Sequence, residues 1–441
     1  MIIKSIQINK LHGQYNRYVE FDSKLTYLYG ANGCGKTTIL NILSAIITGH
    51  FYDLCEYFFE EVRLCYGKGD GNETIVLKMI ESEKETSLQI VFDGEDYKID
   101  DFKNLKERLY RHMDDEGMEK TFIKMYPFVD EISKTFNYVY LPLNRFGGAD
   151  FLERDVYRFG YPRRRYLEMQ QNPYNSYLND SLIYISQLIK DSCMKINFSE
   201  NRINDQFRKN VLSSMISVSD SNKLLEVFDG IQKFKWEEVE DNKSTYIKTL
   251  DEIGVYDKNL EEEIDYFFKS FKKAYEEYSN NSDKTLLGVN LAWQYAEFTK
   301  IRKITELAKD FEKTKNRIRR PMELFLELIE GFFNSSGTKK KPNIDKEGRL
   351  YFEIGNRRLN LRDLSSGEKQ IVITFASMIF GLKGKQTGIF IVDEPEASLH
   401  LEWQKKFVPS ILQTEKNVQL IFATHSPELI GQFRDNAFEI I

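Results

Sequence analysis

The sequence predicts an α/β fold in which a mixed sheet is interrupted by a mainly helical insertion. An alternating apolar run at 25–29 is followed by a glycine-rich segment and then by an apolar-periodic stretch. Alternating helix and strand signals return in the last hundred residues. Between them, stretches such as YLNDSLIYISQLIKDSC and LFLELIEGFF repeat with helical periodicity. We therefore expect an N-terminal lobe at 1–150, a helical insertion at 151–344 and a C-terminal lobe at 345–441.

Composition favours an ordinary soluble globular protein of two structural units. The 441 residues are 41% hydrophobic and 29% charged, with a net charge of −6. This balance excludes a protein that coats nucleic acid through its overall charge, while a local basic face stays open. The four cysteines show no CxxC spacing, which argues against a disulfide framework or a zinc site and favours a reducing cytosol. No apolar run is long enough to span a bilayer, so we expect a cytoplasmic protein without a membrane.

The sequence predicts strands towards both ends of the chain and long helices between them. Strands are expected at Ile2–Ile8 and Val19–Phe21, as short antiparallel strands within 60–100, and at 137–143. The long helices fill 151–333. Strand signals return as RLYFEI and RRLNLRDL, and the remainder alternates helix and strand, which is typical of a parallel sheet.

The glycine-rich segment predicts a phosphate-binding loop (P-loop). Glycines at 30, 33 and 35 allow a tight turn whose N–H groups point at phosphate oxygens, and the helix that follows adds its dipole. Lys36 would supply charge for the β- and γ-phosphates, and the Thr37 hydroxyl suits Mg²⁺. The alternative is a glycine-rich surface turn. The residues expected to contact a nucleoside triphosphate are Gly30, Ala31, Asn32, Gly33, Cys34, Gly35, Lys36, Thr37 and Thr38.

The apolar run at 388–392 ends in two carboxylates. Such a run suits a central parallel strand buried on both faces, and ligands bind at the C-terminal ends of these strands. Asp393 is therefore expected to hold Mg²⁺, and Glu394 to act as general base on the attacking water. The alternative is an acidic pair that caps the next helix.

A second anion-binding site is predicted before the apolar helix that runs to Phe380. Ser365, Ser366 and Gly367 stand at its N-terminus, with Glu368 in the first turn. An ordinary N-cap followed by a glutamate is the alternative.

Here the chain resembles the ABC-type ATPases. The segment Leu364–Gln370, LSSGEKQ, is similar to their signature motif. That resemblance implies that Ser365 and the Gly367 backbone meet the γ-phosphate of an ATP held by a second subunit. Residues 396–400, EASLH, resemble the D-loop, and residues 423–427, ATHSP, resemble the switch-histidine segment. His425 would then contact the γ-phosphate, although a strand-end histidine is commonly structural. His400 is expected to have a structural role.

The particular residues in these motifs restrict the resemblance to one branch of the ABC-type ATPases. DEPEASLH, THSPELI and the long insertion are similar to the SMC/RecF/OLD branch, and most similar to the compact anti-phage ATPases of the Septu (PtuA) and PARIS (AriA) systems. Few residues follow His425, where OLD nucleases have a Toprim domain. The expectation is therefore an ATPase without its own nuclease site, which acts as an oligomeric switch on a nuclease or toxin from a neighbouring gene.

The resemblance also implies ATP and Mg²⁺ as ligands and a homodimer, or a larger oligomer, closed around ATP. Two alternatives stay open. One is a RecF/SMC-like DNA-repair clamp, and the other is an ATP-stabilised scaffold with little turnover. DNA therefore remains a candidate partner.

Several other residues are weaker candidates for contacting nucleotide or nucleic acid. Arg145 stands where relatives have a glutamine loop, and Tyr15 and Arg17 stand where relatives contact the nucleotide. Three basic clusters could bind nucleic acid but are more commonly solvated or protein-binding surfaces. They are Arg163–Arg165, the helical set Lys313, Lys315, Arg317, Arg319 and Arg320, and Lys339–Lys341.

Overall fold

The computed structural model describes most of the chain and divides it into two compact units. Unit 1 contains residues 1–192 and 322–441, and unit 2 contains residues 193–321. The three-part division expected from the sequence stays a prediction. The described residues are 1–68, 71–82, 85–110, 115–141, 173–216, 236–253, 256–280, 285–335, 337–382, 387–414 and 417–440.

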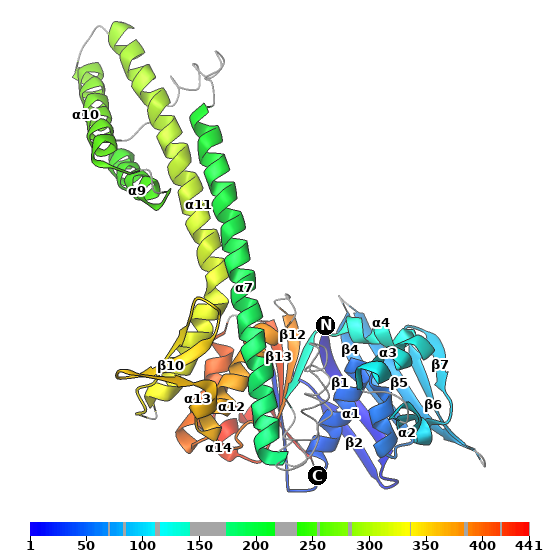
Figure 1. Ribbon diagram of the computed structural model, residues 1–441. Helices are drawn as coiled ribbons and strands as arrows, with labels where there is room; N and C mark the ends of the chain where they lie inside the picture. Colours follow the sequence, from blue (N-terminus) through cyan, green and yellow to red (C-terminus); the bar gives the residue numbers. More distant parts are fainter. Residues whose placement is uncertain are drawn as a thin grey trace. The chain divides into compact units, whose positions relative to one another are not determined.

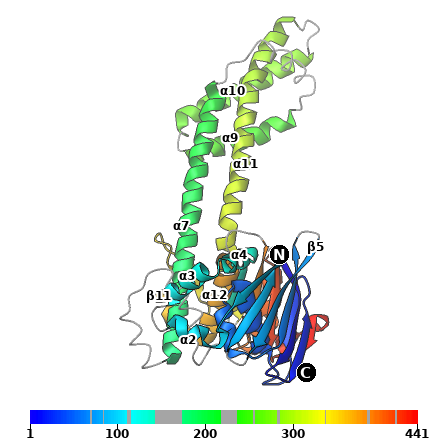
Figure 2. The ribbon, with the colours of Figure 1, turned by 90° about the vertical axis from the view of Figure 1, so that its right-hand side faces the viewer.

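Unit 1 contains a six-stranded antiparallel sheet built from the first hundred residues (Figure 2, blue to cyan). Apolar side chains alternate along its strands and are buried on one face, as expected for a sheet with one solvated side. The antiparallel strands predicted at 60–100 are confirmed. In pairing order, the strands are β2 (Tyr15–Glu20), β1 (Ile2–Leu11), β4 (Glu61–Lys68), β5 (Gly71–Glu81), β6 (Thr86–Phe92) and β7 (Glu95–Ile99).

The second sheet of unit 1 is parallel and brings the predicted motifs to one edge. Its order is β14 (Ala437–Glu439), β3 (Leu25–Tyr29), β13 (Asn417–Thr424), β12 (Thr387–Asp393) and β8 (Tyr138–Leu141). Asp393 lies opposite Ala423, and Thr424 lies opposite Tyr29. The P-loop, the two carboxylates and His425 therefore follow neighbouring strands at the same C-terminal edge.

The fully apolar β12 is buried on both faces, as its sequence predicts. Ile389 and Ile391 belong to the core that also contains the inner face of α1 (Lys36–Thr48). Phe390 and Val392 belong to a second core shared with α12 (Ser366–Ala376) and α13 (Leu401–Leu412). Because side chains alternate along a strand, α1 and α12 cover opposite faces of this sheet (Figure 1).

A buried amide joins the two sheets of unit 1. Gln419 on β13 accepts a hydrogen bond from the Ile3 N–H at 2.8 Å and donates to the Ile3 and Asp22 carbonyls at 2.7 and 2.9 Å. All these polar groups are thus satisfied away from water. The contact fixes β1 beside β13, the strand that His425 directly follows.

Smaller elements complete unit 1. A three-stranded sheet has the order β11 (Arg357–Asn360), β10 (Leu350–Ile354) and β9 (Lys341–Ile344). A π-helical turn, Ser377–Gly381, follows α12 where the sequence predicted a helix that continues to Phe380. The other helices are α2 (Leu105–Tyr110), α3 (Asp115–Met125), α4 (Phe128–Thr135) and α14 (Pro427–Ile430), with 3₁₀ turns at Phe51–Glu56, Phe102–Asn104, Leu361–Asp363 and Arg434–Asn436.

Unit 2 is helical, as predicted for the middle of the chain. Its elements are α9 (Glu237–Ile253), α10 (Lys258–Asn280) and the parts that belong to it of α7 (Pro173–Ile216) and α11 (Thr285–Ser335). Phe268 and Phe271 of α10 pack against Phe298 of α11. Within the described ranges, no helix combines the length and apolar character that crossing a membrane requires.

Candidate functional site

The P-loop lies between β3 and α1, and its glycines have the conformations that the loop requires. Gly33 and Gly35 have φ of +82° and +97°, a region that L side chains rarely adopt. Gly30 is required for a different reason. A Cβ there would lie 2.6 Å from the Ile440 carbonyl oxygen, because β14 pairs directly with β3.

Lys36 is the first residue of α1 and is only 4% exposed. Its Nζ donates to the Gly30 and Ala31 carbonyls at 3.1 and 3.2 Å and lies 3.3 Å from His425 Nδ1. The ammonium group therefore lies within the curve of the loop. The P-loop and the switch-histidine segment, 389 residues apart, meet at this group.

Asp393 fits a cation site. It is 3% exposed, and neither of its carboxylate oxygens has a hydrogen-bond partner within the described part of the chain. An unpaired buried carboxylate is costly unless a proton or a cation compensates it. Thr37 is close enough to influence the carboxyl group of Asp393. No cluster of three or more His, Cys, Asp or Glu side chains suited to a metal occurs among the described residues. The candidate donors at this position are the Asp393 carboxylate and the neighbouring Thr37 hydroxyl. This set suits Mg²⁺, which usually takes one or two protein oxygens plus phosphates and water.

Burial gives Asp393 a pH dependence that can be measured. It raises the pKa of this carboxyl to about 6, with Thr37 opposing the shift and the Glu394 charge adding to it. Between the unfolded value near 3.8 and about 6, the folded state binds more protons. We therefore expect the free energy of unfolding without divalent ions to fall by on the order of 3 kcal/mol as pH rises through this window. Asp393→Asn should remove this decrease. Denaturant unfolding from pH 4 to 7 in chelator would measure it, and identical pH slopes for the two proteins would contradict it.

Glu394 and His425 face each other at the same strand edge. Glu394 Oε1 lies 3.7 Å from His425 Nε2, and both side chains are about one third exposed. Glu394 adopts a left-handed backbone, with φ of +46°, and its N–H donates to the Ala423 carbonyl at 2.8 Å. This strained conformation turns the carboxylate out of the strand direction, where water can reach it. The arrangement suits a general base beside a histidine.

Glu396 is a further residue of this site, which the sequence reading did not single out. Its Oε1 accepts from the Thr424 hydroxyl at 2.7 Å and from the backbone N–H groups of His425 and Ser426 at 2.7 and 3.2 Å. A carboxylate from the segment after β12 thus fixes the backbone on which His425 stands. The sequence signal was a third acidic residue, directly after the Asp-Glu-Pro turn.

The predicted second anion site forms the N-terminus of α12. Ser365 is its N-cap and forms a reciprocal capping box with Glu368. Ser365 and Ser366 are exposed, whereas Gly367 and Glu368 are buried. A Cβ on Gly367 would lie 2.5 Å from the Ser398 carbonyl oxygen, so only glycine allows 396–400 to approach this closely. Contact of Ser365, Ser366, Gly367 and Glu368 with a nucleotide stays a prediction.

The structure thus brings the predicted residues together in two groups. Lys36, Thr37, Asp393, Glu394 and His425 share the C-terminal edge of the parallel sheet. Ser365 caps the N-terminus of α12, which packs on the face of this sheet opposite to α1.

Comparison with known proteins decides the family. The family model described as AAA ATPase domain matches residues 1–430. The chain belongs to the AAA ATPase domain family. The ATPase predicted from the motifs is confirmed by this match. The mixed α/β fold with a helical insertion is confirmed by the structure.

Two curated relatives of this ATPase match over shorter segments. The retron Ec83 probable ATPase of Escherichia coli is 26% identical over 214 residues, which cover 41% of this chain and 39% of that protein. An uncharacterized protein of Dictyostelium discoideum is 31% identical over 91 residues, which cover 19% of this chain and 12% of that protein. The chain thus matches less than half the length of these relatives.

Solved SMC head domains are also similar to this ATPase. The Pyrococcus furiosus Smc head with an extended coiled coil, bound to the C-terminal domain of ScpA, is 13% identical with a TM-score of 0.38, over 99% of this chain and 93% of that one. The SMC head domain from Thermotoga maritima is 11% identical with a TM-score of 0.38, over 99% and 92%.

The residues that the sequence marked as weaker site candidates differ in where they lie in the structure. Arg17 lies 4.9 Å from the centre of the Tyr15 ring, and its Nη2 donates to the Cys34 carbonyl at 3.5 Å, so both side chains border the P-loop. His400 is the N-cap of α13, which is a structural role. Arg145 and Arg163–Arg165 lie outside the described residues.

The other two basic clusters are not uniform solvated patches. Arg319 forms an ion pair with Glu200, and Lys315 lies 3.6 Å from Glu312. Within Lys339–Lys341 the outer lysines are exposed, whereas Lys340 forms an ion pair with Glu368. The interpretation of these two clusters as solvated surface therefore does not hold for Arg319, Lys315 and Lys340, which contact acidic side chains.

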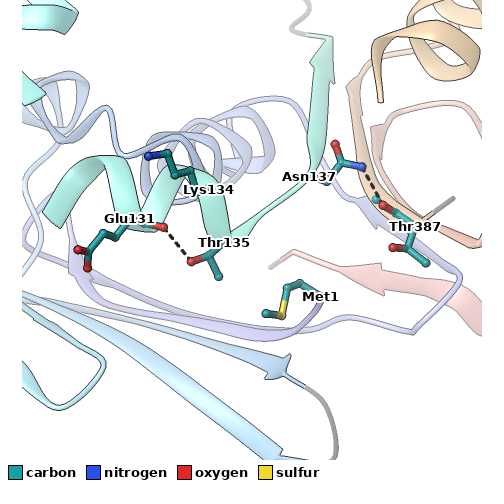
Figure 3. A pocket seen from close by; sticks show the side chains of 7 residues that line it. Met1, Glu131, Lys134, Thr135, Asn137 and Thr387 are labelled. Carbon is teal, nitrogen blue, oxygen red and sulfur yellow. Dashed lines mark hydrogen bonds between the residues drawn. The ribbon is translucent and has the colours of Figure 1, made fainter. Parts of the chain in front are cut away.

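A cavity of about 420 Å³ lies away from this chemistry. It opens at the start of β12 and is lined by Met1, Glu131, Lys134, Thr135, Asn137, Thr387 and Gly388 (Figure 3). Thr387 begins β12 and Asp393 ends it, so the cavity lies about 20 Å along the strand from the carboxylates. It contains none of the predicted site residues.

Proposed function

We propose that this ATPase is a switch in which two chains enclose two ATP molecules head to tail. One observation supports this most directly. The P-loop helix α1 and the signature helix α12 cover opposite faces of one sheet, so their N-termini do not converge on one triphosphate within a chain. A two-fold pair would place each Ser365 beside the nucleotide on the other chain's Lys36, which is an isologous interface.

Each residue group would have its own part in hydrolysis. The P-loop N–H groups and Lys36 bind the triphosphate, and Ser365 of the second chain completes its surroundings. Mg²⁺, held by Thr37 and Asp393, would supply positive charge near the phosphates. Glu394 accepts the proton of the attacking water, and Glu396 holds the backbone of His425 so that its imidazole faces both Glu394 and Lys36.

Mixing two inactive variants tests the enclosure by two chains. Lys36→Ala removes the charge in one half of each site, and Ser365→Arg blocks the other half. We expect each variant to be inactive alone. Co-expressed chains should regain about a quarter of the wild-type ATPase rate, because half the dimers are mixed and each has one complete site. Normal turnover by Ser365→Arg alone, or no recovery in the mixture, would contradict the proposal.

The switch would control a partner effector, a nuclease or toxin, in defence against phage. The motif spelling, similar to that of anti-phage ATPases, supports this, as does the relative named a retron ATPase. Purification of the tagged chain with the product of a neighbouring gene would test it. The amount of effector bound should differ between wild type and Glu394→Gln in ATP, and equal amounts would argue against control by hydrolysis.

A DNA-binding clamp is the second candidate, and one observation favours it. Lys309, Lys313 and Arg317 are exposed on α11 at a spacing of four residues, about 6 Å per step on one face. None of the three forms an ion pair with another described residue. Binding of duplex DNA that weakens steeply with salt, and that is lost when all three become glutamine, would support this candidate.

A further inference from the structure

The middle lysine of Lys339–Lys341 differs from its neighbours. Lys340 Nζ donates to both carboxylate oxygens of Glu368, at 2.7 and 2.8 Å. The two side chains are only 14% and 4% exposed. Lys339 and Lys341 are exposed. A run of three lysines usually indicates a solvated surface, so the inward position of one of them requires an explanation.

The turn after α11 directs Lys340 inward. The Thr338 N–H and hydroxyl both donate to the Phe333 carbonyl, at 3.3 and 3.0 Å, which closes the end of the helix. Gly337 and Lys339 then adopt left-handed backbones, with φ of +74° and +47°. A non-glycine residue in this region is uncommon and needs support from its surroundings. The buried ion pair of Lys340 is one such support.

The end of α11 is itself fixed against the elements around Ser365. Phe333 stacks on Trp403 of α13 at 6.1 Å between ring centres, and Phe332 lies 5.3 Å from Phe375 of α12. Trp403 also lies 3.6 Å from the position of a Cβ on Gly367. Lys340 therefore reaches Glu368 from a rigid base rather than from a mobile loop.

Glu368 connects Lys340 to Ser365, because it forms hydrogen bonds with both residues. Its Oε2 also accepts from the Ser365 backbone N–H at 2.8 Å, while the Glu368 N–H donates to Ser365 Oγ at 3.4 Å. Burial alone would raise the pKa of Glu368, but the hydrogen bonds from Lys340 and Ser365 outweigh it, so the pKa lies below its ordinary value. The carboxylate is ionised and holds the cap of α12.

We propose that Lys340 is a positioning residue for the signature motif: through Glu368 it fixes Ser365 in the orientation that the second chain's nucleotide requires. This inference rests on the proposed enclosure by two chains. Without Lys340, the buried carboxylate would lack its counter-charge and would turn outward to water, which releases the Ser365 N–H. A displacement of about 1 Å at such a contact is enough to slow a reaction by about a hundredfold.

Three variants test the positioning role. Lys340→Met should lower kcat at least tenfold and leave the affinity of the separate chain for ATP within about twofold, because the P-loop is untouched. Lys341→Met is the matched control at the exposed neighbour and should behave as wild type. Lys340→Met with Glu368→Gln should regain most of the activity, because glutamine keeps the capping box without a buried charge. This double variant also covers the case in which Lys340→Met folds poorly. Wild-type kcat for Lys340→Met would overturn the proposal.

Co-expression of pairs of variants distinguishes the positioning role of Lys340 from the proposed enclosure of ATP by two chains. Lys340→Met should regain activity when co-expressed with Lys36→Ala, because each chain repairs the half-site that the other lacks. It should not regain activity with Ser365→Arg, because both changes damage the same half. Recovery of Lys36→Ala by Ser365→Arg but not by Lys340→Met would overturn the positioning role alone. Failure of the Lys36→Ala and Ser365→Arg pair would overturn the enclosure by two chains.

Discussion

Glu394→Gln is expected to slow ATP turnover about a thousandfold while ATP binding is preserved. Glutamine keeps the shape of Glu394, but it cannot take a proton from the attacking water, a contribution of typically 10²–10⁴-fold. Because hydrolysis would reopen the enclosed dimer, the variant should accumulate as an ATP-bound dimer. Steady-state turnover and size-exclusion chromatography with and without ATP would measure the two effects.

The exposed Glu402, in the first turn of α13, provides the matched control for this change. Glu402→Gln removes the same charge from a position outside the strand edge and should leave turnover unchanged. Unchanged hydrolysis in Glu394→Gln would refute the general-base role. Negligible turnover in the wild type together with stable ATP-dependent multimers would instead favour the scaffold alternative.

Lys36→Ala is expected to weaken ATP binding at least a hundredfold, or about 3 kcal/mol. The ammonium group lies inside the curve of the P-loop, within 3.2 Å of two loop carbonyls, where the β- and γ-phosphates are expected. Lys36 is buried, and its hydrogen bonds to described residues include none to a carboxylate. Its charge therefore destabilises the folded state when no nucleotide is bound. The variant should therefore unfold at the same temperature as wild type, or at a higher one.

Calorimetric titration with ATP and thermal unfolding would measure these two quantities. Lys24→Ala, an exposed lysine just before β3, is the control and should bind ATP normally. Loss of affinity in both variants would point to a general electrostatic effect rather than to the P-loop. Retained affinity in Lys36→Ala would contradict the assignment of the loop.

Local signals predicted the elements of the site well. The strand before the P-loop, the glycines with positive φ and the buried strand that ends in Asp393 all follow from neighbouring residues, since backbone conformation and strand burial are encoded over short distances. The start of β2 was missed. Its first residues pair with β1 across an irregular register near Leu11, which gives no clean alternation in the sequence.

Contacts between distant segments could not be predicted from local patterns. Glu396 holds the backbone of His425 from 29 residues away, and Lys340 binds Glu368 from 28 residues away. Glu396 stands in an acidic stretch and Lys340 in a basic run that each resemble solvent-exposed surface. Only their contacts in the folded chain distinguish them from such surface.

The sequence by itself determined which segments form the predicted phosphate-binding loop and supply the carboxylates and the histidine, because each is a short segment that follows its own strand. The tertiary structure alone decided which face of the parallel sheet each helix covers. An apolar strand such as β12 is equally suited to packing on both faces, so its sequence does not say that α1 lies on one and α12 on the other. That arrangement, which follows from how the two core clusters pack, is the reason we propose that a second chain completes the site.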